Sequence, residues 1–506
     1  MKKIILFTTL PLFLFASSTN ENLLKRIELL EKELNNLKSI VKEQNHPIPI
    51  SKFKELENNI ISNSNDIDEI YPIIEHNEKK VILDKVNFSP ELELRMDKLN
   101  YVNNSIENEN TKIYNNLDTS LNNQQRRDEF SKNFDSAGYI RFRLNMDAII
   151  NEKVKFNGRM VFTTSSQTNE RLCILSRDIK SGVSNSALDI DRAYIDYSPN
   201  KSSQYATTFS FGLLPTTGGI PMHYAQDSER KSLFPALVFD MNTYGVIATQ
   251  RLTNQNFLRF VLAKAYTMRD TFYPYQCNRE NIDNATVIGL YYDTKIKFLG
   301  DTLLSAGINS LLDLKAHPYL GPDINANDAN ILGDIFTLGL GIDINNFLNT
   351  KTTIFLHSAI SNPHGNDNID NYQIVNKVEG TTISGDIGFS EADYAQGGMI
   401  SDNGYSIYIG AKYNHSSTLN FGVEYNYGSK YWFSATQGAE DMFNKLATRG
   451  SVGEAYTIWN YYKNLSAKFG YMYSKENYTG SGWHFGEPAK KDATQSVGYI
   501  SLKAKF

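Results

Sequence analysis

The carboxy-terminal stretch QSVGYISLKAKF, residues 495–506, is the part of the chain that best indicates the fold. One side of it, read with a period of two residues, is apolar and consists of Gly498, Ile500, Leu502, Ala504 and Phe506. The other side carries two lysines and consists of Val497, Tyr499, Ser501, Lys503 and Lys505. Such a strand suits a closed barrel with lipid outside and water inside, although any antiparallel sheet with one wet face alternates in the same way.

The same alternation recurs from residue 85 to the end of the chain. It begins at residues 86–97 and continues in a hairpin over residues 138–164, where apolar residues alternate with arginines such as Arg141 and Arg143. Six further strand pairs are expected across short polar turns: 188–198 with 205–213, 243–252 with 257–266, 286–296 with 302–314, 334–344 with 351–361, 403–413 with 418–428, and 453–462 with 465–474. With the first and last strands the total is about sixteen, with a tolerance of two.

Long polar stretches separate these pairs: 98–137, 165–187, 214–242, 267–285, 315–333, 362–402, 429–452 and 475–494. Short turns at one end and long loops at the other are typical of an outer-membrane barrel. The even count puts both ends of the barrel on the short-turn, periplasmic side. A soluble sandwich, the alternative, would need two or more domains at this length. We therefore predict an all-β, transmembrane antiparallel barrel over residues 85–506.

Residues 1–18 are predicted to be a signal peptide. Lys2 and Lys3 form the charged start, residues 4–16 the apolar core, and residues 16–18 the cleavage region. The apolar run is too short for an ordinary membrane helix, and no other run in the chain approaches about 18 residues. A chain of this composition can therefore reside in a membrane only as a barrel.

Residues 19–84 are predicted to form a periplasmic coiled-coil stalk and linker. Apolar residues follow the alternating 4,3 spacing of a coiled-coil seam: Leu23, Ile27, Leu30, Leu34, Leu37 and Val41. This pattern allows a dimer or a trimer, and a single amphipathic helix that packs on its own domain is the alternative. We expect a homotrimer, because three parallel stalks on three barrels about one axis satisfy the heptads.

The composition agrees with a membrane barrel. The chain has 506 residues, a net charge of −5, and 30 Tyr and 28 Phe against 3 Trp. This mild acidity indicates no nucleic-acid partner, and the abundant aromatic residues fit strands and the girdles at membrane interfaces. Cys173 and Cys277 both fall in expected loops, where they form either one disulfide or two free thiols.

Five stretches spread over the barrel region suggest a family: DKVNFSPELELRMDKLNY (84–101), FSFGLLPTTGGIP (209–221), ALVFDMNTYGV (236–246), ATRGSVGEAY (447–456) and YTGSGWHFGEP (478–488). They resemble a porin-like outer-membrane protein family of epsilonproteobacteria. The resemblance implies an outer-membrane barrel, and it implies no particular substrate. The terminal Phe506 also resembles the carboxy-terminal recognition signal of outer-membrane proteins.

A barrel of this size is wide enough for an aqueous channel, and charged side chains on the inner wall would set its selectivity. The alternation places the following residues on the polar face: Arg95, Arg141, Arg143, Lys155, Arg159, Arg192, Glu91, Glu93, Asp97, Asp147 and Asp196. We expect them to line the pore, helped by an infolded loop at residues 215–235. The alternative for any one of them is a solvated wall in which charges pair with one another.

Catalytic and metal-binding motifs are missing from the sequence. It contains no H-E-x-x-H, paired-cysteine or G-x-S-x-G motif, so we expect no enzyme activity and no cofactor. His357 is the strand histidine to examine for a barrel phospholipase, with a structural role preferred. Asp367 and Asp370 could bind calcium in a loop but lack the EF-hand spacing. The predicted function is an outer-membrane porin for small hydrophilic solutes or ions, and the alternative is a structural or adhesive anchor with a plugged barrel.

Overall fold

The computed structural model describes residues 32, 54, 86–104, 130–165, 187–230, 232, 234–265, 285–315, 331–365, 400, 402–436, 441, 443–478, 481, 488 and 490–506. In these residues sixteen strands follow one another: β1 (Val86–Asn103), β2 (Phe130–Asn151), β3 (Val154–Ser165), β4 (Ala187–Tyr197), β5 (Thr207–Leu213), β6 (Thr243–Arg251), β7 (Asn256–Ala265), β8 (Thr286–Lys297), β9 (Asp301–Lys315), β10 (Ile331–Asn345), β11 (Thr352–Gly365), β12 (Gly404–Asn414), β13 (Leu419–Gly428), β14 (Gly450–Tyr462), β15 (Leu465–Tyr478) and β16 (Lys490–Lys505). Two short 3-10 helices, η1 (Phe347–Asn349) and η2 (Lys445–Ala447), lie between strands.

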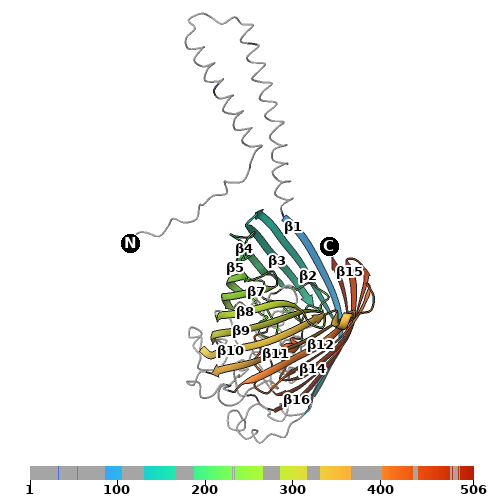
Figure 1. The fold of residues 1–506 in the computed structure, drawn as a ribbon. Coiled ribbons are helices and arrows are strands. Elements are labelled where there is room, and N and C mark those ends of the chain that lie inside the picture. The colour runs from blue at the N-terminus through green and yellow to red at the C-terminus, as the bar shows by residue number, and fades with distance from the viewer. Residues whose placement is uncertain are drawn as a thin grey trace, which may run out of the picture. The chain divides into compact units, whose positions relative to one another are not determined.

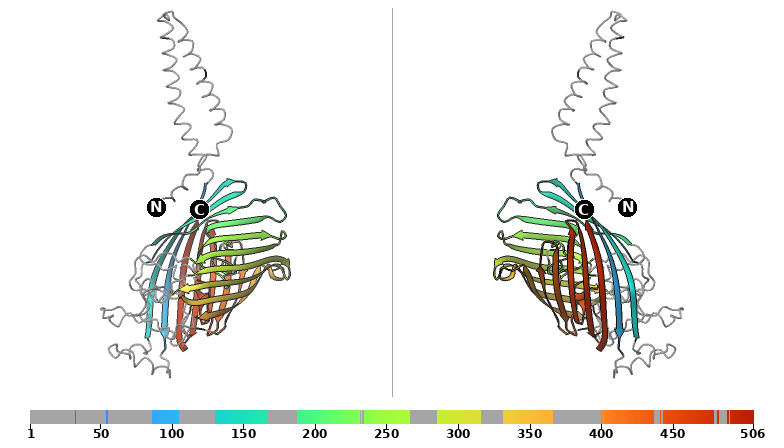
Figure 2. Two further views of the ribbon diagram at one scale, coloured as in Figure 1. Left: turned by 90° about the vertical axis from the view of Figure 1, so that its left-hand side faces the viewer. Right: turned by 90° about the vertical axis from the view of Figure 1, so that its right-hand side faces the viewer.

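The strands form one closed barrel (Figure 1). Each strand pairs antiparallel with the next in the chain, and β1 closes the sheet against β16, with Glu93 opposite Lys503 and Leu94 opposite Leu502. This confirms the predicted antiparallel barrel of sixteen strands. The chain enters β1 and leaves β16 at the same end of the barrel (Figure 2), where the Phe506 amide donates to the Pro90 carbonyl oxygen at 3.0 Å. The predicted signal peptide and coiled coil, and also Cys173 and Cys277, lie outside the described residues.

Connections of two lengths alternate along the chain. Short turns at the end that holds the start of β1 comprise residues 152–153, 198–206, 252–255, 298–300, 346–351, 415–418 and 463–464. At the opposite end the segments between strands are longer, and two of them are well described: the inner loop, residues 214–242, and the second loop, residues 429–449. Among the described residues, no helix combines the length and apolar character needed to cross a membrane.

The outer surface of the barrel is apolar. On β16, Ile500 is 50% exposed and Leu502 46%, whereas the alternate residues Tyr499 and Ser501 are each 5% exposed. The same outward pattern recurs on strands β7 to β12: Leu262, Leu290, Ile308, Leu338, Leu340, Leu356, Ile360, Ile407 and Ile409. Exposed aromatic residues accompany them: Tyr405, Tyr413, Phe421, Tyr425, Trp459, Tyr461 and Tyr473. A soluble protein does not expose so large a continuous apolar surface, so this face meets lipid.

The inner loop is folded into the barrel. Its Phe234, Phe239 and Met241 have no exposed surface, which an external loop of this composition would not achieve. The Asp240 amide donates to the Ala435 carbonyl oxygen of the second loop at 2.9 Å, so the two loops are joined inside the barrel. The expectation of an infolded loop near residues 215–235 therefore agrees with the structure.

An apolar core fills the barrel beside strands β6–β12. It combines inner-loop residues with inward side chains of the wall and of the second loop: Leu214, Phe234, Leu237, Val238, Phe239, Val287, Tyr291, Leu311, Ile335, Phe355, Tyr408, Trp432, Phe433 and Leu446. Phe234 and Tyr291 lie with ring centroids 4.5 Å apart. The inner wall is thus not polar throughout, because the inner loop covers one side of it.

Strands β1 and β2 extend further than the predicted ends at residues 97 and 138. β1 runs to Asn103 and β2 begins at Phe130, and the two strands stay paired over this length. Beyond Asp97 the inward side chains become apolar, because Leu99 and Tyr101 pack in a cluster that includes Phe443 of the second loop. The polar-inward pattern therefore stops before the strand does.

Glycines leave room for rings that lie along the inner wall. Gly470 pairs with Tyr499, and a methyl group at Gly470 would lie 2.2 Å from Cζ of that ring. Gly341 likewise pairs with His357, where a methyl group would lie 2.2 Å from Nδ1. These close approaches hold the rings flat against the neighbouring strand.

Candidate functional site: a charged passage inside the barrel

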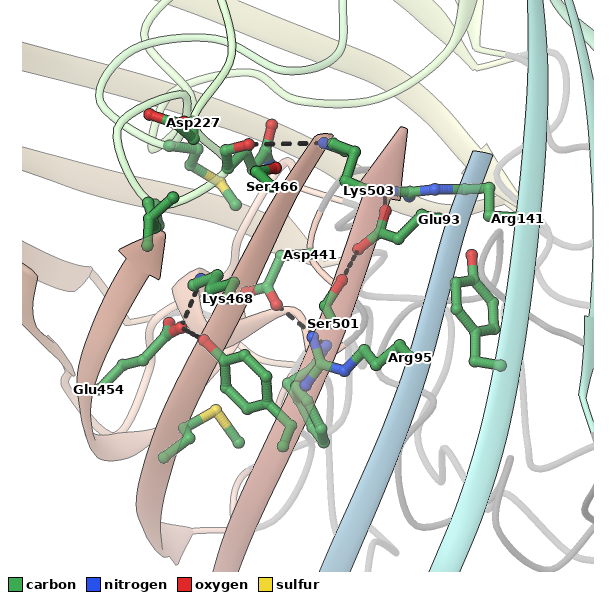
Figure 3. A pocket seen from close by; sticks show the side chains of 18 of the residues that line it. Glu93, Arg95, Arg141, Asp227, Asp441, Glu454, Ser466, Lys468, Ser501 and Lys503 are labelled. Carbon is green, nitrogen blue, oxygen red and sulfur yellow. Dashed lines mark hydrogen bonds and ion pairs between the residues drawn. The ribbon is translucent and has the colours of Figure 1, made fainter. Parts of the chain in front are cut away.

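Two adjoining cavities lie between the inner loop and the strands on either side of the β1–β16 closure. The small cavity has a volume of about 80 Å³ and is bordered by β1, β2, β14, β15 and β16, by the tip of the inner loop and by the second loop. The large cavity, about 540 Å³, opens among the short turns before β13 and β15. Asp227, Ser466 and Lys503 border both cavities, so the two adjoin, and we refer to them together as the passage. Figure 3 shows the small cavity.

The passage carries more positive than negative groups. The cationic residues that border it are Arg95, Arg141, Lys445, Lys463, Lys468, Lys503 and Lys505. The acidic residues are Glu93, Asp227, Asp441 and Glu454. Both signs come from distant parts of the chain, which the closure of the barrel brings together.

Glu93 and Glu454 are tightly held in the wall of the small cavity (Figure 3). Glu93 accepts from Arg141 at 2.5 Å and from the Ser501 hydroxyl at 3.0 Å. Glu454 accepts from Lys445 at 2.6 Å and from Lys468 at 3.0 Å, and it also accepts from the Tyr499 hydroxyl. Neighbouring cations thus compensate the charge of both carboxylates, and hydroxyls add hydrogen bonds to them.

Arg95 lies at the inner end of the small cavity. Its Nε donates to Asp97 at 2.7 Å, and its guanidinium lies 3.9 Å from the centroid of the Tyr499 ring and 5.1 Å from that of Phe443. Its Nη2 has no hydrogen-bond partner within the part of the chain that the structure describes. The rings cover the face of the guanidinium and leave donors at its edge.

The tip of the inner loop is fixed by lysines from two sides. Lys412 of β12 lies 2.7 Å from the Asp227 carboxylate. Lys503 donates to the Gln226 carbonyl oxygen at 3.4 Å, and Lys505 donates to the Asp227 carbonyl oxygen at 3.1 Å. Burial opposes ionisation of Asp227, but the Lys412 ammonium outweighs it and holds the pKa of this carboxyl below its usual value.

Lys445 of η2 connects the second loop to the barrel wall through two ion pairs. It lies 2.5 Å from Glu424 and 2.6 Å from Glu454, on β13 and β14. Burial alone would favour the neutral amine, but the two carboxylates raise the pKa of Lys445 well above its usual value. The Lys445 ammonium therefore stays charged and joins three elements.

A second polar cluster lies inside the barrel beneath the inner loop. His357 of β11 lies 3.0 Å from the Asp343 carboxylate, and both side chains are almost fully buried. The rings of His223 and Tyr224 lie with centroids 3.9 Å apart and their planes tilted by 38°. Burial lowers the pKa of His223 to about 4, so this imidazole is neutral near pH 7. His357 faces the interior and not the lipid, which agrees with the preferred structural role.

Three of the eleven residues predicted to line the pore border the small cavity: Arg95, Arg141 and Glu93. The other eight have different surroundings. Arg143 lies 3.4 Å from Glu91 in a buried pair, and Arg159 forms a buried pair with Asp191.

The remaining residues serve the wall or its rim. Arg192 donates to the Thr217 carbonyl oxygen at 2.8 Å and so holds the inner loop. Asp97 pairs with Arg95, and Asp196 accepts from Ser210 at 2.5 Å and from Asn157 at 3.0 Å. Lys155 and Asp147 are partly exposed and 4.0 Å apart near the β2–β3 turn.

Several residues of the passage were not among the predicted residues: Asp227, Glu454, Lys445, Lys468, Lys503 and Lys505. For Lys503 and Lys505 the signal was present, since both stand on the polar side of the last strand. Asp227 and Lys445 belong to loops, whose inward course no periodicity reveals. Asp367 and Asp370, the possible calcium ligands, lie outside the described residues.

The closed barrel, its apolar exterior and its charged inner passage define a transmembrane β-barrel protein of the outer-membrane type. The family described as "Protein of unknown function (DUF3373)" matches residues 131–503, well over half of the chain, and the protein belongs to this family.

The barrel is similar to solved outer-membrane structures. One is OprB of Pseudomonas putida, with 10% identity over 85% of this chain and 96% of that chain, and a TM-score of 0.43. Another is an anion-selective porin from Comamonas acidovorans, with 11% identity over 83% and 99% and a TM-score of 0.41. The outer membrane channel DcaP of Acinetobacter baumannii has 14% identity over 84% and 98% and a TM-score of 0.39. A comparison with curated protein sequences found no match.

Proposed function

We propose that the protein is an outer-membrane porin, a passive diffusion channel for small hydrophilic solutes or ions. The observation that carries this proposal is the pair of adjoining cavities that share Asp227, Ser466 and Lys503. A barrel of sixteen strands is wide enough for an aqueous passage, and the two cavities beside the inner loop are bordered largely by polar and charged residues. Such transport needs no catalytic residue and no cofactor.

The proposal includes the predicted amino-terminal region. A signal peptide at residues 1–18 would direct export, and a coiled coil within residues 19–84 would lie in the periplasm and join three barrels into a homotrimer. The even strand number supports this placement, because the chain enters β1 at the short-turn end. We also propose that the chain is one of the porin-like outer-membrane proteins of epsilonproteobacteria that its sequence resembles.

Conductance of the purified full-length protein in a planar lipid bilayer tests the channel. Folded protein is identified beforehand by its heat-modifiable migration in detergent gels. A channel gives discrete ohmic steps whose size rises with salt concentration. Folded protein that inserts but gives no steps contradicts the proposal.

A structural or adhesive anchor with a plugged barrel is the second candidate. The apolar core around Phe239, Tyr291 and Trp432 fills one side of the barrel and favours this alternative, as does the small volume of the inner cavity. Absence of conductance from folded protein, together with binding of the protein to cells or to other envelope components, would support the anchor.

A further inference from the structure

We propose that the small cavity is a binding site for a small organic anion, a carboxylate with a short apolar body, and that the passage selects anions. This inference rests on the proposed channel function. Three features of the passage carry it: the balance of charge, the spacing of the lysines on β16, and the apolar surface beside Arg95.

The charge balance favours anions. The carboxylates of Glu93 and Glu454 accept from cations and hydroxyls of the wall, and Asp227 pairs with Lys412. The passage as a whole is bordered by seven cationic and four acidic residues. Five of the seven cations are also paired with carboxylates, among them Arg95 with Asp97 and Lys503 with Glu91. Lys463 and Lys505 form no ion pair among the described residues, so the large cavity that they border favours anions.

Lysines on the last strand lead from the mouth toward the small cavity. Lys505 borders the large cavity, and Lys503, two residues earlier on the same face, borders both cavities. Inward side chains two residues apart on a strand are about 6.6 Å apart along it. An anion can thus pass from one ammonium to the next without a long step between them.

The small cavity also presents apolar surface. Met222 and Ala225 of the inner loop border it together with Phe443, Ile458 and Met472. A bare inorganic anion gains nothing from such contacts, whereas an anion with an apolar body does. A protein cavity of about 150 Å³ can hold benzene, so a cavity of about 80 Å³ suits a body of only a few carbon atoms.

Arg95 is the residue best placed to bind the carboxylate. Its Nη2 has no hydrogen-bond partner among the residues described, and its face is covered by Tyr499 and Phe443. Nε is paired with Asp97, so Nη2 is the guanidinium nitrogen that can donate to a carboxylate. Figure 3 shows Arg95 beside the cavity, on the strand that also carries Glu93.

Butyrate is the probe, and butylammonium is its control of opposite charge. With full-length protein in planar bilayers, the reversal potential in a potassium chloride gradient should show a higher permeability for chloride than for potassium. Butyrate should reduce the chloride current in a saturable manner at concentrations where formate and butylammonium do not.

Two variants separate the charge from the apolar contact. Arg95→Gln should raise the butyrate concentration for half-maximal block about tenfold, the effect of losing one charge-assisted interaction. Met222→Ser should also weaken the block, and it keeps the test valid if Arg95→Gln does not fold. Lys351→Gln, an exposed lysine at a short turn, is the matched control and should leave the block unchanged.

The outcomes are distinct. Conductance with cation selectivity overturns this inference and leaves the channel intact. Anion selectivity without preferential block by butyrate overturns the organic-anion site and leaves only a pathway for inorganic anions. Absence of conductance from folded protein overturns the channel itself, and the inference with it.

Discussion

Lys505, the last residue of the closing strand, donates a hydrogen bond to the carbonyl oxygen of Asp227 at the tip of the inner loop, at 3.1 Å. The two residues are far apart in the sequence and meet only because the barrel closes. Lys503 makes the equivalent contact with Gln226 at 3.4 Å. The strand that completes the wall therefore also positions the loop that narrows the passage.

Replacement of both lysines by glutamine should loosen the loop tip. In the Lys503→Gln, Lys505→Gln variant the loop tip keeps its Lys412 contact but loses both lysine donors on the β16 side. We expect more frequent current fluctuations in single-channel recordings and a lower preference for anions, because two positive charges leave the passage. Lys351→Gln serves as the control, and recordings identical to those of the natural chain would contradict this role.

Gly470→Ala should destabilise the barrel wall. The new methyl group would lie 2.2 Å from Cζ of Tyr499, so the ring would have to leave its position beside Glu454. We expect a loss of about 1–3 kcal/mol in the free energy of unfolding, as for other overpacked sites. The measurement is the urea midpoint of heat-modifiable migration.

Gly453→Ala is the matched control for that substitution. Gly453 lies on the neighbouring strand β14, and no heavy atom of the described residues, its chain neighbours apart, lies within 4 Å of the position of an added methyl group. Equal urea midpoints for the two variants would show that the ring over Gly470 does not contribute to stability.

Acidification should weaken the packing of the inner loop. Burial lowers the pKa of His223 from 6.5 to about 4. Between these two pH values the imidazole is mostly neutral while the loop is packed, but it would be mostly protonated if the loop were released. The packed loop therefore loses stability as the pH falls from about 6.5 to about 4, by at most about 3 kcal/mol. The charged and titratable groups that surround His223 are Arg230, Asp343, His357 and Lys412.

The measurement is the frequency of current fluctuations between pH 7 and pH 4. We expect the frequency to rise in the natural chain as the pH falls. His223→Gln, which has no imidazole to protonate, should show a much smaller rise. An equal rise in both proteins would assign the effect to other groups.

Leu338→Arg tests the assignment of the outer surface to lipid. Leu338 of β10 is 48% exposed among other outward apolar residues. An arginine at such a position should cost about 2–4 kcal/mol near the membrane midplane. The measurement is the free energy of unfolding from lipid vesicles, and Lys351→Arg is the control. A neutral effect of Leu338→Arg would contradict a lipid-facing position.

The strands could be predicted because the alternation of apolar and polar residues is local. On β1 to β4 and on β16 the alternation indicates an outer face that contacts lipid and an inner face that contacts polar groups. It stops at Leu99 and Tyr101, where the inward side chains are apolar because the second loop packs on them. In the sequence alone, the end of the alternation looks like the end of the strand and the start of a loop.

The passage was only partly predictable, because its contacts depend on pairings distant in the sequence. Arg141 and Glu93 could be placed on the polar face, but their ion pair follows from the register of β1 with β2. The contact of Lys445 with Glu454 requires the course of the second loop, for which the sequence contains no periodic signal. Alternation therefore predicts which way a side chain points but not which group it meets.

The closure of β1 on β16 has a consequence for how the protein is made. The inner loop is synthesised long before β16, yet Lys503 and Lys505 reach its tip only when the last strand is in place. A chain that is shortened before β16 therefore lacks both the final pairing of the sheet and two anchors of the loop. Completion of the wall and full anchoring of the loop tip thus depend on the same strand, so an assembly intermediate with an unclosed seam also has an incompletely anchored inner loop.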